Sequence, residues 1–221
     1  MTFLAITYVP DGIAIAADSR LTRNLNYANG LSEKYIMTDN QDKIFILANG
    51  KYGICFHGTN HEGKISTTKL LSNFELEYIN DKDDIQEVAD KLKKYLLNKY
   101  PFRETEFYLV GYSEDEPFVF LVNRRLIERI NVLDKNEVYF GSYWIGDRIL
   151  VSAIKSLIDQ GIFDFELMTV LDAAEMSEFI VSTAVNFQKL QDVFAECGGP
   201  IDVLLITKEY TKFLKYKMNL R

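Results

Sequence analysis

The chain opens on two apolar, β-branched segments, Thr2–Val9 and Ile13–Arg20, which are separated by Pro10-Asp11-Gly12. Two such segments around a Pro, Asp and Gly cluster predict a β-hairpin. Apolar side chains do not alternate with polar ones, so both faces of each strand are apolar. A sheet with two apolar faces has to be covered on both, and these strands are therefore expected inside a stack of layers.

The length of the hairpin loop decides on which face Asp18 lies. A two-residue turn at Asp11-Gly12 would pair Ala5 with Asp18 and place the carboxylate on the face opposite Thr2. A three-residue loop would pair Leu4 with Asp18 and bring Asp18 to the Thr2 face, within roughly 8 Å in an ideal ladder. We predict the three-residue loop, and a slip of one residue would reverse the face.

Polar and helical patterns follow this hairpin. Leu21–Asp42 is polar and rich in Asn, which favours a long loop or a projecting hairpin. Asn49-Gly50 is the strongest short turn signal in the chain and marks a second hairpin. Apolar residues recur at helical spacing from Thr59 onward, and Asp83 or Asp84 can cap a second helix.

Strands and helices then come in groups. Further strands are expected at Glu106–Tyr112, Pro117–Asn123, Leu126–Asn131, Glu137–Phe140, Ile201–Thr207 and Lys212–Tyr216, and further helices at Trp144–Gln160 and Phe165–Lys189. This order predicts one α+β domain over residues 1–221. The expected fold class is a four-layer αββα sandwich of two antiparallel sheets flanked by helices.

Composition and charge exclude several functional classes. The 221 residues include only 4 Pro and no linker-like tract, which favours one domain. A formal net charge of -7 argues against a nucleic-acid partner. No apolar run reaches the roughly 18 residues of a membrane span, and the start lacks the regions of a signal peptide, so we expect a cytoplasmic protein without a membrane partner. Cys55 and Cys197 are too few for a disulfide framework.

The remaining patterns give no sign of a bound metal or cofactor. His57 and His61 lie close together beside Glu62, but the sequence places no third ligand for zinc. Neither a phosphate-binding loop nor a dinucleotide fingerprint occurs. We therefore expect no metal and no cofactor.

Thr2, which directly follows Met1, is the first candidate for chemistry. If Met1 is removed, Thr2 carries both a hydroxyl nucleophile and a free α-amine, whose pKa is typically about 8. One residue then supplies the nucleophile and the base, which is the logic of N-terminal threonine catalysis. While Met1 remains, the same nitrogen is an amide without useful basicity.

An ordered set of motifs accompanies Thr2 along most of the chain. The motifs are GIAIAADSR, KIFIL after a connecting loop, FHGTN, FGSY before a helix, and ECGGPIDVLLI. Together they resemble the proteasome β-subunit family of N-terminal nucleophile (Ntn) hydrolases, and they are closest to its bacterial proteasome-like branch. The resemblance rests on the order of the motifs, because no single one is specific.

The resemblance implies a role for each of five residues. Thr2 is similar to the nucleophile and general base, and Asp18 to the buried carboxylate near it. Lys43 is similar to the lysine that keeps the amine and hydroxyl polarised, and Ser142 to the serine that hydrogen bonds near the threonine amine. A backbone N–H near Gly58 is the expected oxyanion donor.

The chain also departs from the family pattern. The loop before Lys43 is longer than usual, and Lys34 lies at the family's usual distance from Thr2, so Lys34 is the alternative site lysine. We prefer Lys43 because it opens an obvious strand. The late acid of the family would be Asp192, which comes too early relative to Cys197 and is a weak candidate for a distal acid.

The resemblance implies a threonine-type peptidase that cleaves peptide or amide bonds and assembles into ring-like homo-oligomers. The helices around Ile65–Tyr100 and Trp144–Gln160 would form the contacts, and an ATPase or unfoldase partner is left open. Two alternatives to the peptidase remain. The first is a catalytically inactive proteasome-like assembly or binding protein, and the second is a small-molecule amidase of the same Ntn superfamily.

Overall fold

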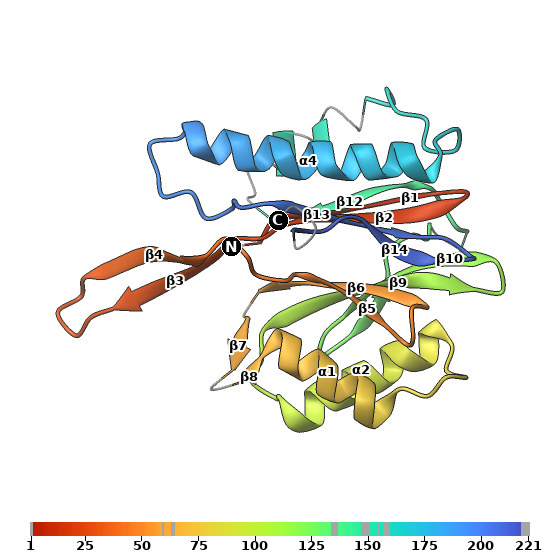
Figure 1. The fold of residues 1–221 in the computed structure, drawn as a ribbon, viewed down its shortest axis with the longest axis horizontal. Coiled ribbons are helices and arrows are strands. Elements are labelled where there is room, and N and C mark those ends of the chain that lie inside the picture. The colour runs from red at the N-terminus through yellow and green to blue at the C-terminus, as the bar shows by residue number, and fades with distance from the viewer. Residues whose placement is uncertain are drawn as a thin grey trace.

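Two five-stranded antiparallel sheets carry the fold in the computed structural model of the chain (Figure 1). The structure describes residues 2–58, 60–62, 65–133, 137–146, 151–153, 155–156 and 160–217, except the side chains of His61 and Glu62. The first sheet has the order β12-β1-β2-β13-β14 and the second β11-β10-β9-β6-β5. The described strands and helices thus agree with the expected α+β class.

The bounds of the elements are as follows. The first sheet contains β1 (Leu4–Val9), β2 (Gly12–Asp18), β12 (Gly141–Ile145), β13 (Ile201–Ile206) and β14 (Thr211–Lys215). The second contains β5 (Ile44–Leu47), β6 (Tyr52–Gly58), β9 (Thr105–Ser113), β10 (Glu116–Val122) and β11 (Ile127–Arg129). Two ribbons are formed by β3 (Leu21–Asn26) with β4 (Ser32–Thr38) and by β7 (His61–Glu62) with β8 (Ile65–Ser66). The helices are α1 (Thr67–Tyr78), α2 (Ile85–Lys99) and α4 (Val170–Leu190).

The two sheets stack face to face, with α4 across the outer face of the first sheet and α1 and α2 on the outer face of the second (Figure 1). Three apolar clusters fill the spaces between these layers. Leu4, Ile15 and Tyr108 belong to the cluster between the sheets. Since the sheets are apolar on both faces, this arrangement explains why the first hairpin shows no alternation of apolar and polar residues.

Helix α4 lies close to its sheet because small residues meet on both sides. Ala173 and Ala184 of the helix are buried against Ala14 and Ala16 of β2. At the start of the helix, a Cβ added to Gly12 would be 2.2 Å from Cγ2 of Val170. A glycine at the start of β2 is therefore required by the packing of α4.

The register of the first hairpin differs from the prediction. Val9 pairs with Gly12 and Leu4 with Ala17, so the loop is the two-residue turn Pro10-Asp11. Asp18 consequently lies opposite Phe3, to which its backbone N–H donates at 3.2 Å, rather than opposite Leu4. Gly12, which we expected in the loop, begins β2 instead, and this shifts every pair of the ladder by one residue.

Several expected elements are displaced. Trp144 and Ile145 were expected in a helix but belong to β12, where Trp144 pairs with Ala5 of β1. Pairing with the edge of β1 suits these β-forming residues and overrides their helical spacing. The expected strand Glu137–Phe140 is reduced to a bridge between Val132 and Val138.

The helical prediction around Thr59 also needs correction. Helix α1 begins only after the short ribbon β7–β8, with Ser66 as its N-cap. Thr59 itself lies outside the described residues. Helix α2 begins as predicted, because Asp84 and Glu87 form a capping box.

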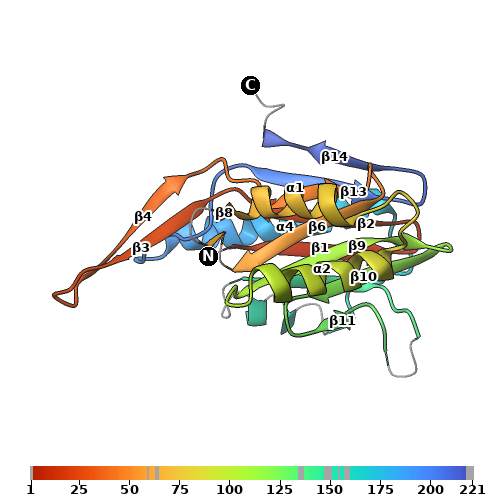
Figure 2. The ribbon, with the colours of Figure 1, turned by 90° about the horizontal axis from the view of Figure 1, so that it is seen from below.

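The polar segment after the first hairpin forms a projecting ribbon, β3–β4, which extends beyond both sheets (Figures 1 and 2). One of the two expected forms, the projecting hairpin, is therefore the correct one. The strands pair only with each other among the described elements. No helix in the described part of the chain is both long and apolar enough to cross a membrane.

Candidate active site

A buried ion pair joins the two sheets near the amino terminus. Lys43, directly before β5, donates from Nζ to Oδ1 of Asp18 at the end of β2, at 2.7 Å. The two side chains are 3% and 0% exposed. Two charges at this depth persist only when each has close partners of opposite sign or strong hydrogen bonds.

Three backbone N–H groups complete the coordination of the Asp18 carboxylate. Phe3 donates to Oδ1 at 2.9 Å, while Arg20 and Gly198 donate to Oδ2 at 3.2 and 3.0 Å. Each carboxylate oxygen therefore accepts two hydrogen bonds, counting the one from Lys43. Such charge-assisted bonds are about twice as strong as neutral ones, and they offset part of the cost of burying the charge.

Thr2 lies at the edge of this arrangement. It is buried, and its neighbour Phe3 is held by Asp18. Phe3 belongs to the apolar layer under α4, whereas Leu4 belongs to the layer between the sheets. Because successive side chains of a strand point to opposite faces, Thr2 is on the same side as Leu4, toward the space between the sheets.

Because the hairpin register differs from the predicted one, Asp18 approaches Thr2 in a different way. Asp18 shares its face with Ala16, on the α4 side, and not with Thr2. Its carboxylate nevertheless binds the N–H of Phe3, the residue bonded to Thr2. The expected proximity is thus achieved around the strand end rather than across one face.

The two candidate lysines have different partners. Lys34 lies on β4 of the projecting ribbon, and its Nζ forms an ion pair with Glu196. Its side chain is 45% exposed. Of the two lysines, Lys43 is the one that pairs with Asp18.

The placement expected for Ser142 is wrong. Ser142 pairs with Thr7 across β1 and β12, and the two hydroxyl oxygens are 2.9 Å apart. Ser177 of α4 donates to the Thr7 hydroxyl at 2.8 Å. At roughly 3.3 Å per residue, Thr7 is about 16 Å from Thr2 along the strand. The displaced start of β12 is the physical reason, because it moves Ser142 toward the far end of β1.

Gly58 ends β6 in a conformation that favours glycine. Its φ is +110°, and an added Cβ would be 2.6 Å from the carbonyl oxygen of Glu104. The strand therefore turns away from its ladder partner Thr105 at this point. Whether a backbone N–H near Gly58 acts as the oxyanion donor stays a prediction.

Asp192 does not join this site. It is an exposed residue in the bend after α4, and within the described residues no hydrogen bond or ion pair links it to Asp18 or Lys43. The acid that does support the site is Asp39, which sequence reasoning missed. Arg20 donates to its two oxygens at 2.7 and 3.0 Å.

The two parallel hydrogen bonds from Arg20 to Asp39, here called the Arg20–Asp39 fork, hold Arg20 against the loop that contains Gly198, one of the donors to Asp18. Arg20 also donates to the carbonyl oxygen of Ala195 at 3.0 Å. A Cβ added to Gly198 would be 2.5 Å from Cζ of Arg20, so the glycine lies directly against the guanidinium. The Asp18-Ser19-Arg20 run was the available sign of this interaction, because an arginine so close to a buried aspartate indicates that a further acid is needed to pair with it.

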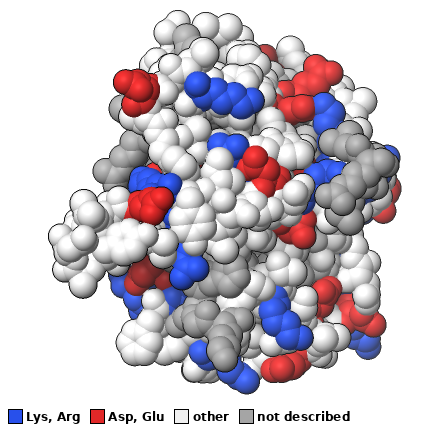
Figure 3. Space-filling view, turned by 60° about the vertical axis from the view of Figure 1, so that its left-hand side comes forward, with Lys and Arg blue, Asp and Glu red and all other residues white. Residues whose placement is uncertain are grey.

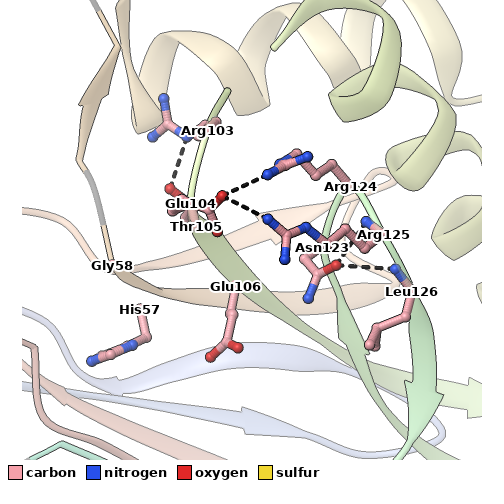
Figure 4. A pocket seen from close by; sticks show the side chains of 10 residues that line it. All are labelled: His57, Gly58, Arg103, Glu104, Thr105, Glu106, Asn123, Arg124, Arg125 and Leu126. Atoms are coloured by element: carbon pink, nitrogen blue, oxygen red, sulfur yellow. Dashed lines mark hydrogen bonds and ion pairs between the residues drawn. The ribbon is translucent and has the colours of Figure 1, made fainter. Parts of the chain in front are cut away.

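A pocket of about 400 Å³ opens beside Gly58 (Figure 4). It is lined by His57, Gly58, Arg103, Glu104, Thr105, Glu106, Asn123, Arg124, Arg125 and Leu126. His57 and Glu106 face each other across β6 and β9. Burial lowers the pKa of His57; the Glu106 carboxylate opposes this effect and the Lys43 ammonium adds to it. The charge of Lys43 thus reaches the rim of the pocket.

The chemistry of the site is that of oxygen, nitrogen and backbone donors. Among the described residues, no three His, Cys, Asp or Glu side chains gather as a ligand set for a metal, and the side chain of His61 lies outside them. Burial raises the pKa of the Cys197 thiol to about 12, so it carries no thiolate nucleophile at neutral pH. Thr2 remains the candidate nucleophile.

No protein-family model matches the chain, and no curated protein matches its sequence. Any family assignment therefore depends on the ordered motifs and on the geometry of Thr2, Asp18 and Lys43.

Proposed function

We propose that the chain is a proteasome-like N-terminal threonine hydrolase, which cleaves peptide or amide bonds after Met1 has been removed. The observation that supports this most is the buried Lys43–Asp18 pair, whose carboxylate also holds the N–H of the residue next to Thr2. The fold proposed with this function is the Ntn hydrolase form of the αββα sandwich.

The proposed reaction uses one residue for two tasks. The Thr2 hydroxyl oxygen attacks the substrate carbonyl carbon and passes its proton to the Thr2 α-amine. A backbone N–H at Gly58 stabilises the oxyanion, a contribution of about 3–4 kcal/mol where such donors have been removed. The C–N bond then breaks as the ammonium returns the proton to the leaving amine. Water, deprotonated by the same amine, hydrolyses the ester and restores Thr2.

Lys43 is proposed to act on this amine electrostatically. A nearby ammonium favours the neutral form of an amine and lowers its pKa, so more of it is available as a base at neutral pH. Asp18 accepts a hydrogen bond from Nζ of Lys43 and so fixes the direction of this side chain. The ring-like homo-oligomer is part of the same proposal, and light scattering of the purified chain measures its mass.

The first experiment is the intact mass of the purified chain together with three variants. Thr2→Ala is expected to abolish cleavage of a fluorogenic peptide, because it removes the nucleophile. Lys43→Met is expected to lower kcat by about 100-fold or more, in the range for acid–base and electrostatic groups. Lys34→Met, which removes an ammonium from the ribbon, should leave kcat within about twofold. Full activity of Thr2→Ala, or a Met1 that is never removed, would contradict the proposal.

One observation favours the inactive assembly or binding protein as a second candidate. The resemblance implies that Ser142 lies beside the threonine amine, but its hydroxyl is hydrogen bonded to that of Thr7 instead. If Met1 stays attached while the chain assembles normally, this candidate replaces the hydrolase.

A further inference from the structure

We infer that the pocket beside Gly58 binds an acidic side chain of a peptide substrate, through Arg124 and Arg125. The inference rests on the proposed function, because Gly58 is both a wall of this pocket and the expected oxyanion donor. A substrate whose carbonyl lies at Gly58 has a neighbouring side chain within reach of the pocket. Its volume of about 400 Å³ falls within the roughly 300–1,000 Å³ of typical ligand sites.

Two guanidinium groups converge on a single carboxylate at the mouth of this pocket. Arg124 and Arg125 donate to the same oxygen of Glu104, at 2.6 and 3.2 Å. In Figure 4 the Arg124 and Arg125 side chains both approach the Glu104 carboxylate from one side, whereas the side chains of His57 and Glu106 extend away from them. Since two positive charges share one negative charge, this part of the pocket keeps a net positive charge.

The pocket also holds more donors than the protein uses. A guanidinium has five N–H donors. Nε of Arg124 is buried and lacks a hydrogen-bond partner among the described residues. Carboxylates are the groups that a guanidinium binds best, often through two parallel bonds.

Glu104 marks the place that a substrate carboxylate would take. Its side chain is 67% exposed, as is that of Arg125, whereas that of Arg124 is 21% exposed. The Arg124 guanidinium holds the pKa of Glu104 below its usual value, so Glu104 is ionised at neutral pH. An exposed ion pair contributes little to stability, and a second carboxylate can therefore replace Glu104 at low cost.

The loop that carries the arginines is held in shape by its own hydrogen bonds. Oδ1 of Asn123 accepts from the backbone N–H groups of Arg125 and Leu126, at 2.8 and 3.0 Å. The arginines thus start from a fixed backbone on the short connection between β10 and β11. Preorganisation of this kind lowers the entropy that binding costs.

The test compares fluorogenic peptides that are identical except for Glu or Gln, placed in turn at each position flanking the scissile bond. For the position that enters the pocket, we expect wild type to prefer Glu by about tenfold in kcat/KM. The double variant Arg124→Met and Arg125→Met should abolish this preference. Glu104→Gln should increase it several-fold, because the competing carboxylate is gone. Raising the salt concentration should weaken it.

Lys82→Met is the matched control, because it removes one positive charge from the exposed connection between α1 and α2. This connection lies near the Asn49 turn, at the other end of β6 from Gly58, as the hydrogen bond from Asn49 to Asp81 indicates. The Glu preference of this variant should equal that of wild type. Thermal unfolding of every variant checks that the fold is retained.

The outcomes separate this inference from the proposed function. Cleavage with equal rates for Glu and Gln peptides at every position, or a preference that survives in the double variant, overturns the inference and leaves the hydrolase proposal intact. If no peptide is cleaved, fluorescence anisotropy of dye-labelled Glu and Gln peptides decides. Tighter binding of Glu peptides that is lost in the double variant supports the pocket without the hydrolase, and equal binding overturns it.

Discussion

His57 shows how the surroundings of one residue set its charge. It precedes Gly58, faces Glu106 on the next strand and lies within the influence of Lys43. Burial, the largest effect, disfavours the imidazolium form, and Glu106 compensates only in part. His57 is therefore neutral in the folded protein over a wider pH range than in the unfolded chain.

This shift predicts a dependence of stability on pH. The folded pKa of His57 is below the unfolded value of about 6.5, so the unfolded chain binds the proton more readily. The stability contributed by the neutral imidazole is present above about pH 6.5 and is lost as the pH falls through the folded pKa. Urea unfolding between pH 5 and 8 should show this loss in wild type and a shallower slope in His57→Gln. Equal slopes for the two proteins would refute the prediction.

At the scale of elements, the ends of strands carry most of the site. β2 ends on Asp18, Lys43 precedes β5, and β6 ends on Gly58. Edges and ends of strands leave backbone groups and side chains outside the ladder, and these are available for a site. The exact end of β6 therefore matters more for the site than its interior.

Gly58→Ala tests the end of β6. The substitution places a Cβ at a φ of +110° and within 2.6 Å of the Glu104 carbonyl oxygen, so we expect a loss of about 1–3 kcal/mol in the free energy of unfolding. Gly50→Ala is the control, because Gly50 has a φ of +93° but no atom within 4 Å of an added Cβ. Its loss, measured by the same denaturant titration, should be smaller. Equal losses would mean that the contact with Glu104 relaxes freely.

The pairing of Lys43 with Asp18 was predictable from the sequence, because one lysine opens a clear strand and the resemblance names both residues. The register at Asp18 was not, because Pro10-Asp11 and Asp11-Gly12 are both acceptable turns and only packing chooses between them. Ser142 was misplaced for a related reason. The boundary of β12 depends on pairing with β1, which is distant in the sequence.

The pocket was beyond the reach of the sequence altogether. His57 and Glu106 meet because β6 pairs with β9, and Arg124 reaches Glu104 because β10 pairs with β9 as well. No local pattern indicates the pairing of β6 with β9, since helices α1 and α2 lie between these two strands in the sequence, whereas β9 and β10 follow each other directly as a hairpin. Long-range pairings of this kind are decided by the whole fold.

At the scale of the molecule, the Asp18–Lys43 pair connects the two stacked sheets. Elsewhere the sheets meet through the apolar cluster between them and through Lys217, a buried lysine that pairs with Asp202 of β13 and with Asp42, which precedes β5. Acidic and basic side chains are interspersed over the face shown in Figure 3, so no field of one sign dominates that face. The buried pair of Asp18 and Lys43 connects the two sheets, so its loss should lower the free energy of unfolding of the whole protein.

Asp18→Asn leaves the Lys43 ammonium buried without its counter-charge, so we expect a loss of about 3–5 kcal/mol in the free energy of unfolding. Adding Lys43→Met to this variant should recover part of the loss, because no unpaired charge remains. Asp192→Asn, at an exposed position, should change stability by no more than about 0.5 kcal/mol. Chemical denaturation of the four proteins measures these values. A neutral Asp18→Asn would show that the pair contributes nothing to stability.

The fork between Arg20 and Asp39 joins the two feet of the projecting ribbon, because Arg20 precedes β3 and Asp39 follows β4. Two parallel hydrogen bonds between Arg20 and Asp39 therefore set the distance between the two ends of the ribbon, whatever the length of its outer part. The ribbon can therefore be lengthened, shortened or given a foreign peptide at its Tyr27–Leu31 tip while Asp18 and Lys43, just inside the feet, keep their positions. That makes the tip a natural handle for immobilising or labelling the protein.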